Sequence, residues 1–229
     1  MSDALSKLHA KIVKCRQCER LVQWREEVAE VKRRAYRDET YWGRPVTGFG
    51  DPKAKLVIVG LAPGAHGANR TGRIFTGDRS GDFLYAALHR KGFANQPTSR
   101  SRDDGLKLTN AFITCPVRCV PPENQPTPEE VRTCRPFLSA ELSLLRPRVF
   151  LALGHLAWKA CLDFLDWPKP LPDFSHGVRV KHPGRELFLL GSFHVSQQNT
   201  QTGRLTEAMF DRVLEGARSL LDLPARRGG

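Results

Sequence analysis

The sequence contains no long run of apolar residues. None of its apolar stretches approaches the roughly twenty residues that a helix needs to cross a bilayer, and the N-terminal segment Met1–Lys14 lacks the hydrophobic stretch of a secretion signal. We therefore expect a cytoplasmic protein with no part in a membrane. Internal repeats are also missing, and the only low-complexity segment is the tail 224–229, which we expect to be disordered.

Acidic residues are in the minority. The 229 residues include 24 Asp and Glu against 36 Lys and Arg, which gives a formal net charge of +12. Such an excess favours a polyanionic partner, because a protein that neutralises phosphates releases their condensed counterions. A well-solvated basic surface is the alternative.

Cysteine is present at only six positions. In a reducing compartment these are better explained as thiols or metal ligands than as a disulfide framework. Cys15 and Cys18 form a Cys-x-x-Cys pair, and Cys119 and Cys134 flank a proline-rich loop. Four thiolates from two separate segments can close a tetrahedral site, which suits either zinc or an iron–sulfur cluster. The two remaining cysteines, Cys115 and Cys161, are expected to be buried free thiols.

Hydrophobic periodicity predicts alternating strands and helices. Thr127-Pro128-Glu129-Glu130 combines a cap residue, a proline at the first helical position and acids in the first turn, so a helix should begin at Pro128. The expected helices cover 4–36, with a step inserted at Cys15–Cys18, and 82–91, 128–145, 155–164 and 206–221. The expected strands cover 56–60, 107–114, 148–153 and 187–190.

This alternation indicates an α/β fold. We expect a three-layer αβα arrangement with a central, mostly parallel four-stranded sheet, formed by a single domain over residues 1–223. Ligands of such folds bind at the carboxyl ends of the strands. The loops that follow the predicted strands are therefore the places to search for a site.

The loop after the first strand is rich in glycine. Residues 60–78 read GLAPGAHGANRTGRIFTGD and contain five glycines, so backbone amides can approach a ligand closely. The segment lacks the lysine-hydroxyl ending of a nucleoside-triphosphate loop and the spacing of a dinucleotide fingerprint. A generic phosphate-binding loop remains the alternative.

A second polar segment, 194–200, reads HVSQQNT and follows directly after the last strand. Taken in order, the two segments resemble the two signature motifs of the uracil-DNA glycosylase superfamily, a Gly-x-x-Pro-Gly loop and a His-Pro-Ser-like loop. In detail they resemble family 5, the type b enzymes, which read much like Gly-Leu-Ala-Pro-x-Ala-His-Gly-x-Asn-Arg-Thr-Gly-Arg and His-x-Ser-x-Gln-Asn-Thr. The resemblance extends from about Cys15 to Phe210.

The resemblance implies the uracil-DNA glycosylase fold and a monomeric DNA-repair enzyme. Such an enzyme hydrolyses the N-glycosidic bond of uracil in DNA and leaves an abasic site, after flipping the nucleotide out of the stack. The resemblance also implies other deaminated bases as substrates, hypoxanthine and xanthine among them. It implies a four-iron four-sulfur cluster on Cys15, Cys18, Cys119 and Cys134, with zinc as the second possibility.

The resemblance further implies three catalytic residues. His194 would stabilise the negative charge that develops at O2 of the departing uracil, preferably as a neutral imidazole whose tautomer is fixed by a neighbour. Asp78 would assist the attacking water or the cationic sugar, or else simply cap the next helix. Asn124 would contribute at the rim of the site, or else be an ordinary turn residue.

The expected substrate-binding residues come from the same two motifs. Phe75 would stack on the flipped base, with an ordinary core phenylalanine as the alternative. The full expected set is Gly60, Ala62, Gly64, Phe75, Ser196 and Gln198. Two residues depart from related families: Val195 replaces a usual proline, and Cys115 replaces a uracil-reading asparagine, which suggests looser base selection. Neither Gly64 nor Ala65 supplies the water-activating side chain that several related families carry.

Arginines around the proposed site are candidates for contacts with DNA phosphates. The group consists of Arg70, Arg73, Arg79, Arg118 and Arg204. Two rival functions stay open: a cluster-bearing module that binds DNA without cutting it, and a zinc-bearing hydrolase of free nucleotides.

Overall fold

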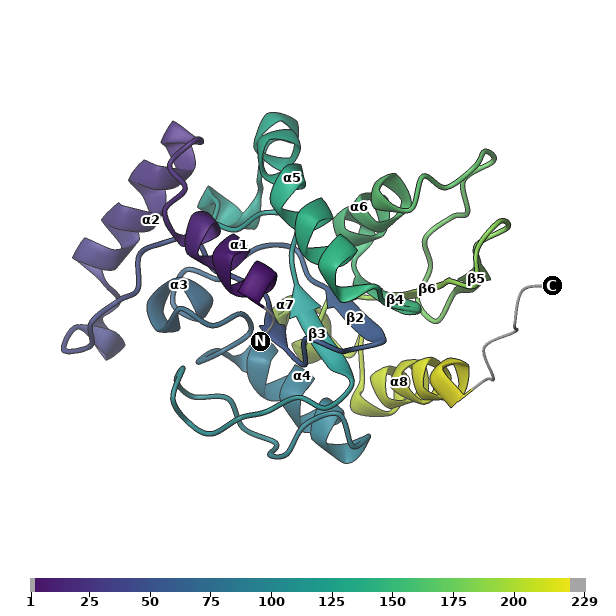
Figure 1. Ribbon diagram of the computed structural model, residues 1–229. Helices are drawn as coiled ribbons and strands as arrows, with labels where there is room; N and C mark the ends of the chain where they lie inside the picture. The colour runs from purple at the N-terminus through teal and green to yellow at the C-terminus, as the bar shows by residue number, and fades with distance from the viewer. Residues whose placement is uncertain (1–2, 223–229) are drawn as a thin grey trace.

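The computed structural model describes residues 3–222, so the expected tail 224–229 lies outside it. All strands of this region belong to one six-stranded sheet with the order β1-β3-β2-β4-β6-β5 (Figure 1). Their bounds are β1 Phe49–Gly50, β2 Leu56–Val59, β3 Ala111–Thr114, β4 Val149–Leu153, β5 Arg179–Lys181 and β6 Phe188–Ser192.

The four central strands are the four that the sequence predicts, and they run parallel. The expectation of four strands is nevertheless too low, because β1 and β5 add antiparallel edges. These edge strands are two and three residues long, which is too short to show an alternation of apolar and polar residues in the sequence. The predicted α/β fold class is confirmed, and the sheet is a mixed one of six strands.

Eight α-helices and two short 3₁₀ helices surround the sheet in this region. They are α1 Asp3–Val13, α2 Glu19–Val31, η1 Arg34–Tyr36, α3 Ala68–Thr71, α4 Arg79–Arg90, η2 Pro122–Asn124, α5 Pro128–Leu145, α6 His155–Phe164, α7 Gln197–Gln201 and α8 Glu207–Asp222. The segment 4–36 forms α1 and α2 on either side of the expected step at Cys15–Cys18, and the prediction is wrong only after Val31, where α2 ends. No helix of residues 3–222 is both long and apolar enough to span a membrane.

The predicted start of α5 is confirmed in detail. The Thr127 hydroxyl accepts a hydrogen bond from the backbone N–H of Glu130, and the Glu130 carboxylate accepts one from the N–H of Thr127. This capping box satisfies two backbone donors at the helix end. It places the start of α5 firmly after the loop that carries Asn124.

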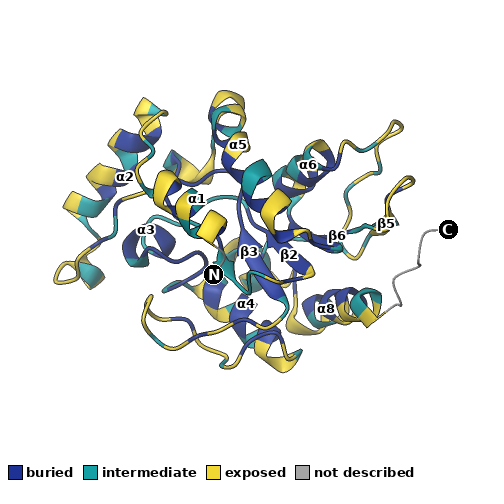
Figure 2. Ribbon diagram, in the orientation of Figure 1, coloured by how far each residue is buried: buried dark blue, intermediate teal, exposed yellow. Residues whose placement is uncertain are grey.

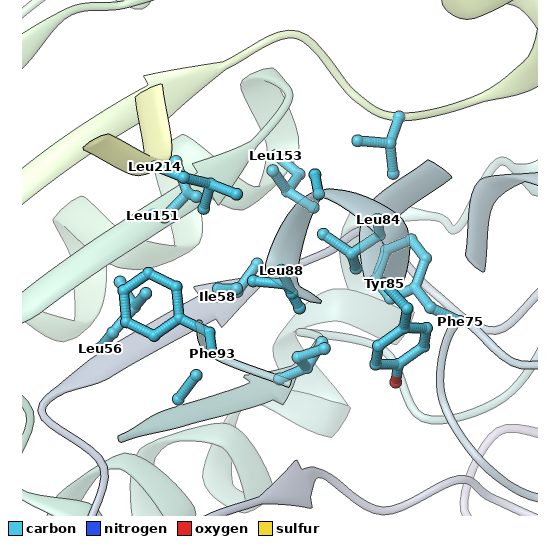
Figure 3. Close-up of a cluster of buried hydrophobic side chains, with 14 of the residues drawn as sticks. Leu56, Ile58, Phe75, Leu84, Tyr85, Leu88, Phe93, Leu151, Leu153 and Leu214 are labelled. Atoms are coloured by element: carbon cyan, nitrogen blue, oxygen red, sulfur yellow. The ribbon is translucent and has the colours of Figure 1, made fainter. Parts of the chain in front are cut away.

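Helices cover both faces of the sheet. Side chains alternate along each strand, so Leu56 and Ile58 of β2 pack toward α4 and α8, while Val57 and Val59 pack toward α5 and α6. Figure 1 shows these two helical layers on opposite sides of the sheet. The strands between them are buried and the outer faces of the helices are exposed (Figure 2). Figure 3 shows the cluster between β2, β4, α4 and α8.

The strand order places a switch point between β2 and β4. From β2 the chain moves to its parallel neighbour β3 on one side, and from β4 it passes through the edge strand β5 to its parallel neighbour β6 on the other. At such a point the connections leave the sheet in opposite directions and open a crevice at the carboxyl ends of the strands. The glycine-rich loop after β2 and the His194 segment after β6 both start at this edge.

A buried carboxylate joins α1, β3 and α5. Glu141 of α5 is fully buried, and its oxygens accept hydrogen bonds from His9 Nε2 at 2.8 Å, Gly48 N at 3.2 Å, Arg118 Nη2 at 2.8 Å and the Thr114 hydroxyl. Burial acts to raise the pKa of Glu141, but Arg118 and these hydrogen bonds outweigh it and lower the pKa to about 2. The group therefore stays ionised in the folded protein.

Replacing Glu141 by alanine should destabilise the fold by about 3 to 5 kcal/mol, because it leaves the buried Arg118 cation without its carboxylate. For a chain of this size the melting temperature should fall by about 6 to 20 °C, measured by circular dichroism at pH 7. The contribution of Glu141 is present above its ordinary pKa of 4.5 and is lost as the pH falls toward 2. Glu129→Ala, an exposed change on the same helix, should shift the melting temperature by under about 2 °C; equal shifts would contradict the assignment.

Candidate active site

Both motifs meet in one cleft at the carboxyl edge of the sheet. The cleft has a volume of about 650 Å³, and its walls come from the glycine-rich loop, from η2 and from the segment after β6. The lining residues are Leu61, Ala62, Gly64, Phe75, Asp78, Ser80, Glu123, Asn124, His194, Ser196, Gln197, Gln198, Asn199 and Arg204. The space is sufficient for a nucleobase and its sugar, since ligand pockets commonly have volumes of about 300 to 1,000 Å³.

His194 stands directly after β6 and lines the cleft. Its carbonyl oxygen accepts a hydrogen bond from Asn199 Nδ2 at 2.8 Å, which ties the strand end to the start of α7. Burial lowers the pKa of the imidazole from 6.5 to about 4, so the ring is neutral at pH 7. The expected neighbour that fixes the tautomer is not found, since no described residue hydrogen-bonds to the ring.

Two neighbours hold the backbone of the His194 segment. Val195 is fully buried in the core cluster beneath the cleft, so core packing anchors the position where related families carry proline. On the other side, His176 Nδ1 accepts a hydrogen bond from the N–H of Phe193 at 3.2 Å, and the two rings stack with centroids 5.0 Å apart. His176 lies in a loop without a motif, so the sequence offers no signal for it.

Asp78 caps α4 and also lines the cleft. Its Oδ1 accepts a hydrogen bond from Gly81 N at 2.9 Å, while a Cβ added at Gly67 would lie 1.9 Å from its Oδ2. Glycine at position 67 is therefore required for the carboxylate to occupy this place. Burial raises the pKa of Asp78 above its ordinary value, although the hydrogen bond from Gly81 opposes the shift. Both interpretations of Asp78 fit its position, because its Oδ1 caps the helix and the residue also lines the cleft.

Phe75 forms the apolar wall beside His194. The two ring centroids are 6.0 Å apart with planes inclined at 34°, and Phe75 is 8% exposed at the edge of the core cluster (Figure 3). Its backbone has φ +50°, a conformation that is uncommon outside glycine. A Cβ at Gly60 would lie 2.8 Å from the Phe75 ring. Gly60 thus supports the ring from behind rather than lining the cleft.

Asn124 sits at the rim in a strained turn. It has φ +58°, and Glu123 before it has φ +53°. Two consecutive non-glycine residues in the left-handed region cost of the order of 1 to 3 kcal/mol each, and such strain clusters at functional sites. Both side chains are exposed and line the cleft. The turn interpretation of Asn124 is correct for its backbone, and the side chain is available to a ligand.

The other expected substrate-binding residues are also brought together. Ala62, Gly64, Ser196 and Gln198 line the cleft. Cys115 does not: it is fully buried and its Sγ donates to the Val117 carbonyl oxygen at 3.1 Å. This thiol packs in the core and does not line the cleft.

The expectation for the arginines is mostly wrong. Arg70, Arg73 and Arg118 are buried and bonded within the protein: Arg70 to the His66 and Gly77 carbonyls, Arg73 to Ser99 and Asp104, and Arg118 to Glu141. They hold loops in place and are not available to phosphates. Arg79 and Arg204 are exposed, and Arg204 lines the cleft with its guanidinium 4.6 Å from the Phe193 ring centroid.

The four candidate metal-ligating cysteines line a second, separate cavity. Cys15 and Cys18 come from the segment before α2, Cys119 from the loop after β3, and Cys134 from α5. The cavity between them has a volume of about 20 Å³. No group of three or more His, Cys, Asp or Glu side chains within residues 3–222 is arranged to hold a metal ion. The thiols therefore surround a space and do not meet at one point.

The burial of the His194 ring predicts its protonation state. The ring of His194 should remain neutral through pH 6.5 and take up a proton only near pH 4, because burial disfavours the imidazolium. Heteronuclear NMR of the ¹⁵N-labelled protein between pH 8 and pH 4 measures this directly, with exposed His89 as the reference signal. A His194 signal that titrates at or above pH 6.5 would be incompatible with the half-buried, neutral ring.

Comparison with known proteins confirms the family. A family model described as the uracil DNA glycosylase superfamily matches residues 47–218. A type-5 uracil-DNA glycosylase of Mycobacterium tuberculosis is 54% identical over 222 residues, which cover 96% of this chain and 82% of the relative. Another from Thermus thermophilus is 53% identical over 210 residues, covering 91% and 94%. One from Pyrobaculum aerophilum is 45% identical over 207 residues, covering 90% and 89%. The chain belongs to the uracil-DNA glycosylase superfamily and, within it, to the type-5 enzymes.

Proposed function

We propose that the protein excises uracil from DNA by hydrolysing the bond between the base and the deoxyribose. The observation that carries this proposal is the neutral, half-buried imidazole of His194, which shares one cleft with Phe75 and Asp78. The relatives that are 53% and 54% identical over the aligned residues are uracil-DNA glycosylases, which supports the same reaction. The alternative of a DNA-binding module without activity has no comparable support.

His194 acts on the leaving group. The bond between C1′ and N1 breaks with its electron pair moving onto uracil, where negative charge collects chiefly at O2. A neutral N–H donor aimed at O2 stabilises that charge most strongly in the transition state and needs no proton transfer. A neutral ring also leaves the departing base anionic until solvent protonates it.

Asp78 acts on the other side of the reaction. The sugar acquires oxocarbenium character as the base departs, and a nearby carboxylate stabilises this positive charge. A water molecule then adds to C1′ and transfers a proton to Asp78 or to solvent, which leaves the abasic site. The burial-raised pKa of Asp78 makes the carboxylate a better proton acceptor than an exposed aspartate.

DNA must present its base to this cleft in a flipped conformation, because C1′ is inaccessible inside the duplex. The polar helix α7 begins right after Ser196, and Gln197, Gln198 and Gln201 project from it as exposed side chains. We assign α7 to the DNA surface next to the flipped nucleotide. Exposed Arg79 and Arg204 flank the cleft and replace the buried arginines as candidates for phosphate contacts.

We extend the proposed substrates to hypoxanthine and xanthine in DNA. Phe75 offers a flat apolar surface, which accepts pyrimidines and purines alike. The position of a uracil-reading asparagine in a related family is taken by Cys115, which packs into the core away from the cleft. Fewer base-specific contacts favour a wider range of deaminated bases.

We further propose that Cys15, Cys18, Cys119 and Cys134 hold a four-iron four-sulfur cluster. Four thiols around one cavity match the ligand set of such a cluster, in which each thiolate binds a different iron. A single zinc ion, which needs four sulfurs about 2.3 Å from one point, is the alternative. When bound, the cluster would join α2, the loop carrying Asn124 and α5, and the proposed reaction requires no redox step.

The protein is proposed to act as a monomer in the cytoplasm. A reducing compartment preserves the thiols that the cluster needs. Among the described residues, the exposed large hydrophobic side chains are Val31, Leu144 and Leu171, which lie in three separate segments. Scattered apolar residues of this kind do not form the continuous patch typical of an obligate interface.

The excision reaction can be tested on oligonucleotides that contain a single uracil, hypoxanthine or xanthine. The wild-type protein should release the base and leave an alkali-labile site. His194→Ala should slow the single-turnover rate by about 10² to 10³-fold, the usual loss when one preorganised donor is removed. His89→Ala is the matched control, because His89 is exposed on α4. DNA binding without base release would favour the inactive binding module, and equal rates for wild type and His194→Ala would refute the proposed mechanism.

The cofactor is tested by metal analysis of protein purified without oxygen. The wild type should be brown and contain about four iron and four acid-labile sulfide atoms per chain. Cys119→Ser should lose most of both, whereas Cys161→Ser should retain them, because Cys161 is also buried but belongs to α6 and does not line the cysteine cavity. Colourless protein that contains one zinc per chain would contradict the cluster.

A further inference from the structure

Two arginine side chains are buried beside the four-cysteine cavity. Arg25 of α2 is 2% exposed and Arg118, in the loop after β3, is 1% exposed. Both residues line the cavity together with the four cysteines. Arginine remains charged in proteins, so two positive charges lie beside the four thiols.

Several of their hydrogen-bond donors have no partner in the protein. Among the described residues, Arg25 Nε, Arg118 Nε and Arg118 Nη1 are buried without an acceptor. Buried guanidinium donors are normally satisfied, because an unpaired one keeps the full cost of its desolvation. The unpaired donors indicate an acceptor or an anion that the polypeptide itself does not supply.

Arg25 and Arg118 both form hydrogen bonds to cysteines of this cavity. Arg25 Nη1 donates to Cys119 Sγ at 3.0 Å and to the Cys15 carbonyl oxygen at 3.2 Å. The backbone N–H of Arg118 donates to Cys134 Sγ at 3.3 Å. Hydrogen bonds of this kind stabilise a thiolate and orient the sulfur toward a metal.

Carboxylates balance only part of this charge. Arg118 shares Glu141 with His9. For Arg25 the one carboxylate within ion-pair distance is Glu26, at 3.7 Å, and that group is half exposed and also pairs with Arg16. Arg25 thus lacks a buried carboxylate partner among the described residues.

We propose that Arg25 and Arg118 are the charge-compensating partners of the cluster, which they stabilise by offsetting its negative charge and by hydrogen-bonding to Cys119 and Cys134. The inference rests on the cluster proposed above. Four thiolates and four sulfides leave such a cluster anionic, and its burial requires nearby positive charge. The two arginines should therefore slow loss of the cluster and raise its reduction potential, since positive charge favours the more negative, reduced form.

Full-length Arg25→Gln tests this directly, because glutamine keeps a polar donor and removes the charge. Two readouts are needed besides activity: the rate at which a chelator removes iron, and the midpoint potential from an anaerobic spectroscopic titration. Iron loss should be about 10- to 100-fold faster than in the wild type, and the midpoint potential should become more negative. Arg25→Lys keeps the charge but loses the fork geometry, so its potential should stay near that of the wild type while iron loss is still faster.

Arg132→Gln is the matched control. It removes the same charge two positions from Cys134, but its side chain is exposed on α5, so both readouts should equal those of the wild type. Iron loss and potential unchanged in Arg25→Gln would overturn the inference while leaving the cluster in place. Wild-type protein without iron and sulfide would overturn the cluster itself. If Arg25→Gln yields no folded protein, Arg25→Lys decides, and wild-type iron retention there contradicts the role of Arg25.

Discussion

Removal of water from one imidazole is the physical condition on which the proposed chemistry depends. His194 lies at the end of β6, with Val195 packed in the core directly after it and the Phe75 ring 6.0 Å away. The resulting desolvation keeps the ring neutral. A neutral ring is also a better match to a departing anion that must be stabilised by a hydrogen bond alone. The unusual backbone at Phe75 and the glycines around it follow from the need to build this wall.

The cleft and the cysteine cavity share one connecting loop. The segment between β3 and α5 carries Arg118 and Cys119 at one end and the strained Glu123–Asn124 turn at the other. Arg118 is held by Glu141, which also binds α1 through His9, and Cys119 faces the cavity. A group bound in that cavity would thus stabilise the loop that positions Asn124. The N-terminal helices serve the site through this loop, although they do not line the cleft.

Sequence patterns predicted the fold and the location of the site well where local physics decides. The four central strands, the start of α5 and the meeting of the two motifs are confirmed, because buried strands, a capping box and strand-end loops leave local signals. The patterns failed where tertiary contacts decide. Arg70, Arg73 and Arg118 look like surface cations in the sequence, but all three are buried. Arg73 and Arg118 bind carboxylates that are distant in sequence, Asp104 and Glu141, while Arg70 binds carbonyls of its own loop. The edge strands β1 and β5 form only because they pair with neighbouring strands. His176 acts through its contact with Phe193 after β6, which lies elsewhere in the sequence.

The central claim is that a neutral His194 ring donates a hydrogen bond to the base as it leaves. A crystal structure of the protein with DNA containing an uncleavable 2′-fluorinated deoxyuridine tests this most directly. The account predicts a flipped uracil in the cleft beside Phe75, with a ring nitrogen of His194 about 3 Å from its O2. A base bound elsewhere, or a His194 ring turned away from O2 with another donor in its place, would contradict the account.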